Sequence, residues 1–292
     1  MVKQAFLGAF GQPETAINDK IRSYKPTEDD IYFTVPSGNY CNLIVAGDVL
    51  REREIEELAK FKAFLAENGL TVPSGWIDER NAVVRLLQHL HYDSQKVYDE
   101  IMRLDENYRE HRVNLPNTLP DLLEDLNKGI VYAYGRDNAM RPIIIVNARR
   151  MLDHNTDTER LGQLIEMITN YLYFLGFVDG VVEGWSVIVD FKDVSLWELP
   201  LMKIAALVKF NTKTFRGVLV RCITVHTHSL IVASKRVVFS VLNEFTKMKT
   251  DLIGDDVADQ LGPIFGLANL EEKYGGQLPN KESDFWPPQV AF

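Results

Sequence analysis

Cysteine is scarce in this sequence of 292 residues, and its scarcity excludes two kinds of framework. The only cysteines, Cys41 and Cys222, lie far apart in the sequence and form no CxxC pair. Neither a disulfide scaffold nor a cysteine-rich metal site can therefore organise the fold. We expect a protein of the reducing cytoplasm.

Long apolar runs are also missing. No stretch approaches the ~18 residues that a membrane-spanning helix needs, and residues 5–10 are too short for the apolar core of a signal peptide. Val2 stands where an N-myristoylated chain requires glycine. These absences predict a soluble protein that associates with membranes only peripherally.

The common cofactor and nucleophile motifs are absent as well. The chain has no GxGxxG after a strand, no GxxxxGK[ST] and no GxSxG. A cofactor-binding oxidoreductase is therefore disfavoured, and we expect no enzyme activity, no catalytic residue and no cofactor. His226 and His228 would share one strand face as a metal pair, but no third ligand follows, so no metal site is predicted.

Acidic residues are nearly absent from one part of an otherwise acidic chain. The net charge of -9 disfavours a nucleic-acid partner, and we expect a monomer. Residues 201–250 nevertheless contain a single acid, Glu244, and a net charge of +8. This block predicts docking on an anionic membrane surface, unless its charges lie on several separate solvated faces. Its basic residues are Lys203, Lys209, Lys213, Arg216, Arg221, Lys235, Arg236, Lys247 and Lys249.

What is present is a pattern of alternating helices and strands. A composition of 46% hydrophobic and 25% charged residues is that of a globular chain with a full core. A hairpin is expected at 31–35 and 40–46, with turn residues between. Helices fit 49–68, 79–91, 94–111, 158–175, 196–210 and 230–249, and apolar strands fit 142–146, 187–191 and 218–225. The pattern predicts an α/β fold whose mostly parallel sheet is flanked by helices.

The stretch VIVDFKDVSL, residues 187–196, carries the most conspicuous acids. Asp190 and Asp193 follow a buried-looking strand, as catalytic acids often do, but Lys192 lies between them and no nucleophile is identifiable. We favour a capping or ion-pair role at the strand end.

Five segments in order resemble the CRAL-TRIO lipid-binding family, which includes phosphatidylinositol/phosphatidylcholine transfer proteins. They are VVRLLQHLHYDSQKVYDEI (83–101), ENYREHR (106–112), GRDNAMRPIIIV (135–146), VIVDFKDVSL (187–196) and EEKYGGQLP (271–279). The resemblance implies a helical N-terminal lobe and an α/β domain that encloses an apolar lipid pocket behind a gate helix. It divides the chain into an extension (1–75), the helical lobe (76–112), the lipid-binding domain (113–280) and a tail (281–292).

The resemblance also implies which residues contact the lipid. Residues 229–247 correspond to the gate helix. The gate helix, the sheet floor and the turn at the end of VIVDFKDVSL together line the implied pocket. The implied pocket-lining residues are Ile143, Ile145, Val187, Val189, Ser195, Leu219, Ile223, Val238, Val241, Leu242 and Phe245. Lys249, His91 and Arg216 match or neighbour headgroup-binding positions, whereas Phe215 replaces the glutamate of the transfer proteins.

The implied function is to bind a hydrophobic lipid, most simply a phospholipid, and to transfer or present it between membranes. The ligand stays open among phosphoinositides, other phospholipids, sterols, tocopherol-like prenols and haem. The alternative is a scaffold or regulatory module without lipid exchange, in which Phe174, Phe177 and Trp185 fill the pocket.

Overall fold

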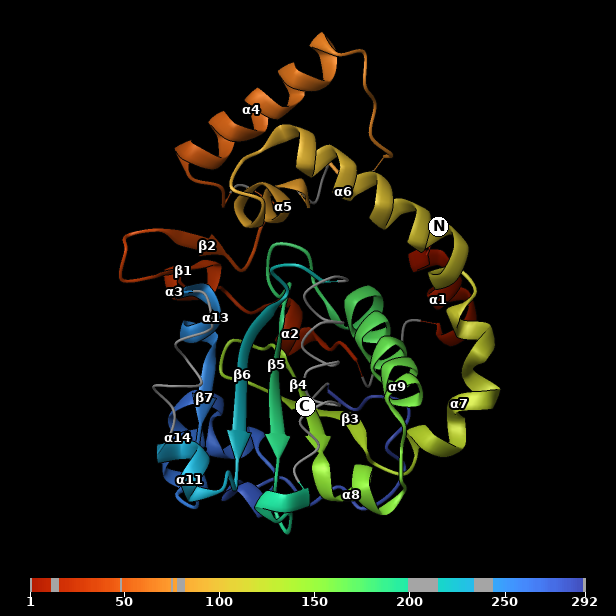
Figure 1. Ribbon diagram of the computed structural model, residues 1–292, viewed down its shortest axis with the longest axis vertical. Coiled ribbons are helices and arrows are strands. Elements are labelled where there is room, and N and C mark those ends of the chain that lie inside the picture. Colours follow the sequence, from red (N-terminus) through yellow and green to blue (C-terminus); the bar gives the residue numbers. More distant parts are fainter. Residues whose placement is uncertain are drawn as a thin grey trace.

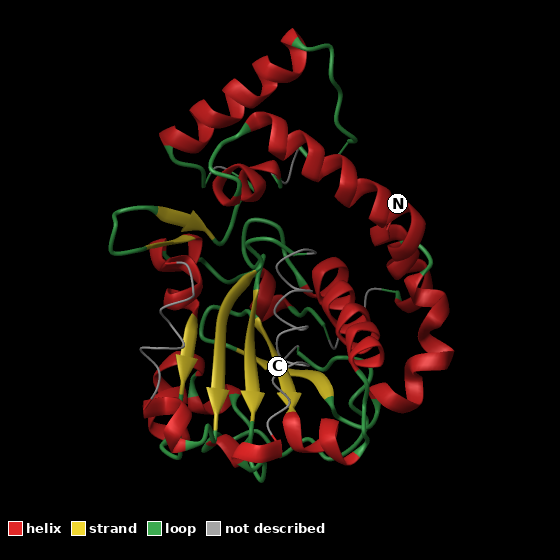
Figure 2. Cartoon of the chain, in the orientation of Figure 1, coloured by secondary structure: helices red, strands yellow, loops and turns green. Residues whose placement is uncertain are grey.

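The computed structural model describes residues 2–11, 16–47, 49–74, 76–77, 82–198, 215–233 and 244–290. A five-stranded sheet lies beneath a lobe of helices, and further helices border it (Figures 1 and 2). The predicted α/β class, with a helical lobe and a mostly parallel sheet, is confirmed. The strands of the sheet are β3 (Val131–Arg136), β4 (Pro142–Asn147), β5 (Trp185–Asp190), β6 (Leu219–Val225) and β7 (Thr250–Leu252).

The five strands lie in the sheet in their sequence order. β3 and β4 form an antiparallel hairpin, and β4, β5, β6 and β7 are parallel to one another. β4, β5 and β6 were predicted because each is a run of apolar residues. β3 and β7 were not predicted; the three residues of β7, Thr-Asp-Leu, include only one large apolar side chain.

The two faces of the sheet are covered by different helices. Ile144, Val187 and Cys222 are paired across β4, β5 and β6, so they share one face, which packs against helix α9 (Thr158–Tyr171). We call this the α9 face. The opposite face packs against helix α14 (Val257–Phe265) and is called the α14 face.

The predicted floor of the pocket must be corrected, because it mixes these two faces. Side chains along a strand alternate between faces, so neighbouring strands must be in register before a common face can be named. Val187, Val189 and Leu219 lie on the α9 face. Ile143, Ile145 and Ile223 belong to the cluster of the α14 face and cannot line the same pocket.

The helical lobe has a core of its own. It consists of α4 (Glu52–Glu67), α5 (Val83–His89) and α6 (Ser94–Asn107), whose apolar stripes pack together. Leu58, Phe61 and Leu65 form the stripe of α4, as the helical spacing predicts. The lobe thus includes α4, which the boundary at residue 76 separates from it.

Both ends of the chain pack onto the sheet domain. Helix α1 (Val2–Phe10) buries Phe6 against Phe174, with ring centroids 5.5 Å apart. At the other end, Trp286 and Val290 are buried, so described residues of the predicted tail belong to the core. The remaining α-helices are α2 (Asp19–Arg22), α3 (Glu28–Ile31), α7 (Leu119–Leu126), α8 (Ala148–Asp153), α11 (Ser229–Ala233) and α13 (Glu244–Lys249).

The expected N-terminal hairpin is present. It consists of β1 (Tyr32–Thr34) and β2 (Tyr40–Asn42), paired antiparallel, and we call it the β1–β2 hairpin. It lies between the helical lobe and α13 (Figure 1). The expected second strand is shorter than predicted. Leu43 and Ile44 donate to the carbonyl oxygen of Ile31 outside the strand pairing, and Val45 and Ala46 bind Glu183 of the sheet domain.

Glycines explain the closing YGG segment. Gly275 has a φ of 82°, a conformation that side chains disfavour. A Cβ on Gly276 would lie 2.1 Å from the carbonyl oxygen of Leu270, so no larger residue fits there. The two glycines let the chain fold back tightly beside Leu270.

Candidate functional site

Lys249 lies at the edge of the sheet where the parallel strands begin, at the junction of α13 and β7. Its Nζ is 5.1 Å from the centroid of the Phe33 ring in the β1–β2 hairpin. Burial lowers the pKa of this lysine, and the Arg85 guanidinium lowers it further. Within the described part of the chain, no carboxylate forms an ion pair with it. Lys249 is therefore a desolvated cation whose charge is not balanced by a described acid.

A histidine stands beside Lys249, but it is His89 rather than His91. Burial, followed by the positive charge of Lys249, lowers the pKa of His89 to about 4, so its ring is neutral at pH 7. Its Nδ1 lies 2.8 Å from the carbonyl oxygen of Arg85. His91 is exposed in the turn after α5. The sequence signal for His89 was its position inside the apolar run VVRLLQHL.

Arg216 lies in the same region, but its guanidinium is already bound by a carboxylate. Its Nε donates to Glu100 Oε1 at 2.9 Å, so an acid of α6 already pairs with it. It lies close enough to His89 to lower the pKa of that ring. Arg216 is therefore paired with Glu100 and does not offer an open hydrogen-bond donor beside Lys249.

A buried ion pair fixes the walls of this region. Arg85 of α5 and Glu183, before β5, are both buried, and Arg85 Nη2 lies 2.9 Å from Glu183 Oε2. Arg85 also donates to the carbonyl oxygens of Leu43 (2.9 Å) and Gly217 (2.7 Å). One guanidinium therefore joins the helical lobe, the N-terminal extension and the start of β6.

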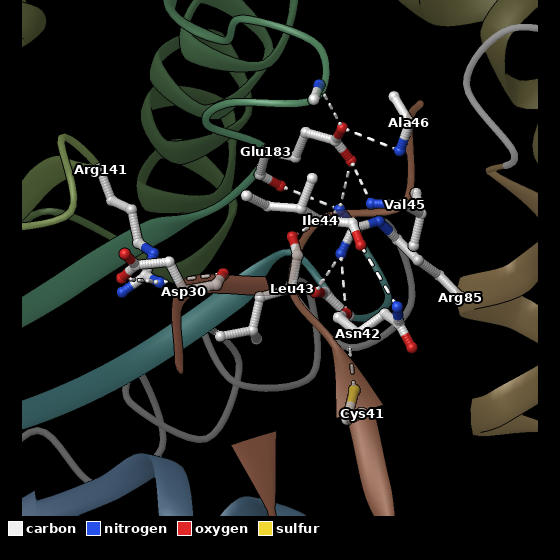
Figure 3. Close-up of polar contacts among 12 residues, drawn as sticks. Asp30, Cys41, Asn42, Leu43, Ile44, Val45, Ala46, Arg85, Arg141 and Glu183 are labelled. Carbon is white, nitrogen blue, oxygen red and sulfur yellow. Dashed lines mark hydrogen bonds and ion pairs between the residues drawn. The ribbon is translucent and has the colours of Figure 1, made fainter. Parts of the chain in front are cut away.

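The carboxylate of Glu183 binds the extension from the other side. Glu183 Oε2 accepts the backbone N–H of Val45 at 3.0 Å, and Oε1 accepts those of Ala46 (3.0 Å) and Gly180 (2.9 Å) (Figure 3). We call Arg85, Glu183 and the backbone of residues 42–46 the clasp. Both carboxylate oxygens accept hydrogen bonds here, which is what a buried charge requires.

A second ion pair anchors the same extension further along the sheet domain. Asp30 Oδ1 lies 3.2 Å from Arg141 Nη2 (Figure 3). Asp30 Oδ2 accepts the Tyr24 hydroxyl at 2.7 Å. These hydrogen bonds and the arginine hold the pKa of Asp30 below its usual value despite its partial burial. Residues 30–46 are thus bound at both ends.

The α9 face offers an apolar surface that is only partly covered. Cys222 keeps accessible area, yet burial raises the pKa of its thiol to about 11. Leu219 and Thr224 on the same strand are likewise only half-buried.

The remaining predicted residues are scattered or lie outside the described ranges. Ser195 is exposed after β5, and its hydroxyl donates to Glu198 Oε2 at 2.7 Å. Phe245, in α13, packs on Phe33 with ring centroids 5.9 Å apart. Val238, Val241 and Leu242, in the middle of the predicted gate, lie outside the residues that the structure describes.

Aromatic side chains do gather at the beginning of β5. Trp185 contacts Phe177 and Phe215, with ring centroids 5.6 and 5.1 Å apart, and Tyr173 contacts Phe174 and Phe215 at 5.0 and 5.4 Å. Phe174, Phe177 and Trp185, the residues that would fill the pocket in a scaffold, therefore belong to one packed group. It fills one end of the α9 face, next to Arg85.

Asp190 has the structural role that the sequence favoured. Its Oδ1 accepts the N–H of Lys192 and lies 2.8 Å from His226 Nδ1. Its Oδ2 accepts the Tyr274 hydroxyl at 3.0 Å, and burial together with Asp190 raises the pKa of that tyrosine well above its usual value. Asp190 thus joins the ends of β5 and β6 to the closing YGG segment. No cluster of metal-binding side chains occurs among the described residues.

The profile of the CRAL/TRIO domain matches residues 126–276, just over half of the chain. The chain belongs to the CRAL/TRIO domain family. Its fold is similar to the crystal structure of Sfh5, with a TM-score of 0.53 and 12% sequence identity, over 82% of this chain and 94% of that one. No curated protein sequence matches significantly.

Family membership gives the protein a lipid-binding and transfer scaffold. CRAL/TRIO proteins are in general lipid carriers rather than enzymes. The matched range contains the whole sheet but neither the helical lobe nor the β1–β2 hairpin. No helix in the described ranges is long and apolar enough to span a bilayer.

Proposed function

We propose that the protein binds one amphipathic lipid against the α9 face, with a phosphate-bearing headgroup at Lys249, and carries it between membranes. The observation that carries this proposal is the desolvated charge of Lys249. Lys249 is half-buried, and no described carboxylate pairs with it, so the free protein holds this charge at a desolvation cost. A lipid phosphate would supply the missing negative charge.

The apolar part of the ligand has a matching surface. Val187, Val189 and Leu219 offer hydrocarbon on the α9 face, where Leu219 and Cys222 are only half-buried. Moving a 16-carbon chain from a bilayer into water costs about 13 kcal/mol, at ~0.8 kcal/mol per methylene. A second apolar environment removes most of this barrier, which is the physical basis of lipid transfer.

The edge of the sheet opposite Lys249 carries the features of a membrane contact. Trp197 is 93% exposed and Leu230 is 59% exposed, and they follow the adjacent strands β5 and β6 at the ends where these strands finish. Tryptophan prefers the interface between membrane and water. The sequences that continue from these two positions, 199–214 and 234–243, contain five basic residues and no acid. We infer that this edge docks on an anionic membrane.

Docking by Lys249 itself, which the +8 block implied, does not fit its position. Its ammonium faces Phe33, and burial lowers its pKa. Two other members of the block are neutralised within the molecule, Arg216 by Glu100 and Arg221 by Asp251. Of the described members of the block, Lys249 therefore belongs to the proposed lipid site, and Arg216 and Arg221 belong to internal ion pairs. The five basic residues of 199–214 and 234–243 lie outside the described residues.

A transfer assay tests the proposed function and the docking edge together. We expect the protein to move a fluorescent phospholipid from donor vesicles to acceptor vesicles that contain anionic lipid. Trp197→Ala should slow transfer about tenfold by removing apolar contact with the membrane, while the amount of bound lipid stays the same. Ile55→Ala, at a 57% exposed position on α4, is the matched control and should transfer at the parental rate.

Two outcomes of this assay would count against different parts of the account. A parent protein that transfers no lipid contradicts the function. A Trp197→Ala variant as fast as the parent contradicts only the docking edge.

A further inference from the structure

The base of the β1–β2 hairpin is firmly anchored. The N–H of Asn42 donates to Gln88 Oε1 at 3.0 Å, and Gln88 Nε2 donates back to Asn42 Oδ1 at 2.8 Å. Tyr40 donates its hydroxyl to Glu54 Oε2 at 2.9 Å. Asn42, Gln88 and Glu54 are buried. Breaking these bonds would leave buried polar groups without a partner, so the base stays attached to α4 and α5.

The tip of the hairpin is held in a different way. Glu244, the first residue of α13, accepts the N–H of Ser37 at 2.9 Å and its hydroxyl at 2.6 Å. Both bonds are exposed, so water can replace either partner. The tip can therefore leave α13 at much smaller cost than the base can leave the helical lobe.

Between base and tip, Phe33 contacts both the first turn and the end of α13. Its ring packs edge-on against Phe245 at 5.9 Å, and Lys249 Nζ lies 5.1 Å from its centroid. α13 has only six residues, so a movement at Glu244 also shifts Phe245 and Lys249. The hairpin thus covers the ammonium that the proposed function assigns to the headgroup.

We propose that the β1–β2 hairpin is a latch, which is held on α13 through Ser37 and Glu244, covers Lys249 with Phe33, and must release before a lipid can exchange. The proposal rests on the proposed function, since it gives the latch something to retain. The hairpin lies outside the range that matches the CRAL/TRIO domain. The latch is thus a device that the N-terminal extension adds to the lipid site.

A charge-exchange cycle tests the latch. Ser37→Asp places a second carboxylate beside Glu244, and Glu244→Lys removes the acceptor of both bonds. Each single variant, loaded with fluorescent lipid, should release it to neutral acceptor vesicles about fivefold faster than the parent. The double variant places the new aspartate opposite the new lysine and should return to within about twofold of the parental rate. Thr34→Ala, an exposed change on the same hairpin, should release lipid at the parental rate.

Hydrogen exchange of the α13 amides supplies a readout that needs no lipid. We expect faster exchange at Phe245 to Lys249 in both single variants and recovery in the double variant. Single variants that carry lipid but release it at the parental rate, or a double variant no slower than the singles, would overturn the latch. A parent protein that carries no lipid would instead overturn the proposed function, and the α13 amides would still test the contact.

Discussion

Replacing Lys249 with methionine should weaken the binding of an anionic phospholipid by roughly 10- to 100-fold, while a neutral diacylglycerol should bind as before. The loss corresponds to about 1.5–3 kcal/mol for a hydrogen bond between charged groups. Methionine keeps the apolar stem, so packing against Phe33 is retained. Fluorescent-lipid titration of delipidated protein would measure both affinities, with Lys247→Met as the control on the same helix.

Two further readouts separate a ligand role of Lys249 from a structural one. Because the free protein holds this charge at a desolvation cost, Lys249→Met should melt at the same temperature as the parent or higher. The affinity for anionic lipid should be full at neutral pH and should fall at alkaline pH as Lys249 loses its proton. That fall should begin below the ordinary lysine pKa of 10.5, since burial lowers the pKa of Lys249. Equal loss for both lipids would show that Lys249 only maintains the fold.

Breaking the clasp should produce the largest effect on stability. Arg85→Met leaves the Glu183 carboxylate buried without its cation, which should lower the free energy of unfolding by about 3–5 kcal/mol. For a chain of this size the melting temperature should fall by roughly 10 °C. The amides of Val45 and Ala46, which donate to Glu183, should exchange faster with solvent.

The controls for the clasp come from the same chain. Arg149→Met removes a partly exposed partner of Asp153 and should leave the melting temperature unchanged. Arg85→Met combined with Glu183→Gln removes both buried charges and should recover part of the lost stability. A single Arg85→Met variant that melts within about a degree of the parent would show that the extension is held by other contacts.

The sheet could be predicted because the composition of its central strands is locally distinctive. PIIIV and WSVIV are apolar enough to be buried on both faces, and the turn residues at 36–39 specify the N-terminal hairpin without any distant partner. The face on which each strand residue lies could not be predicted. That depends on register, which for β4, β5 and β6 is set by backbone pairing between strands that long stretches of chain separate.

The site was only partly predictable for the same reason. Lys249 was proposed through its resemblance to a family position, whereas the clasp joins Arg85 to Glu183, 98 residues away in the sequence. Within VVRLLQHLHYD, the point at which α5 ends decides whether His89 or His91 lies near Lys249. The helix finishes at His89 and the chain turns at His91, which sends the second ring into solvent.

Native mass spectrometry of the purified protein, followed by lipid extraction, tests the central claim most directly. We expect one lipid per chain, with a phosphate-containing headgroup, and its loss from the Lys249→Met variant in favour of neutral lipid or none. A parent protein that carries no lipid, and takes up none from vesicles after delipidation, would contradict the account. It would favour a scaffold whose pocket is filled by the aromatic group around Trp185.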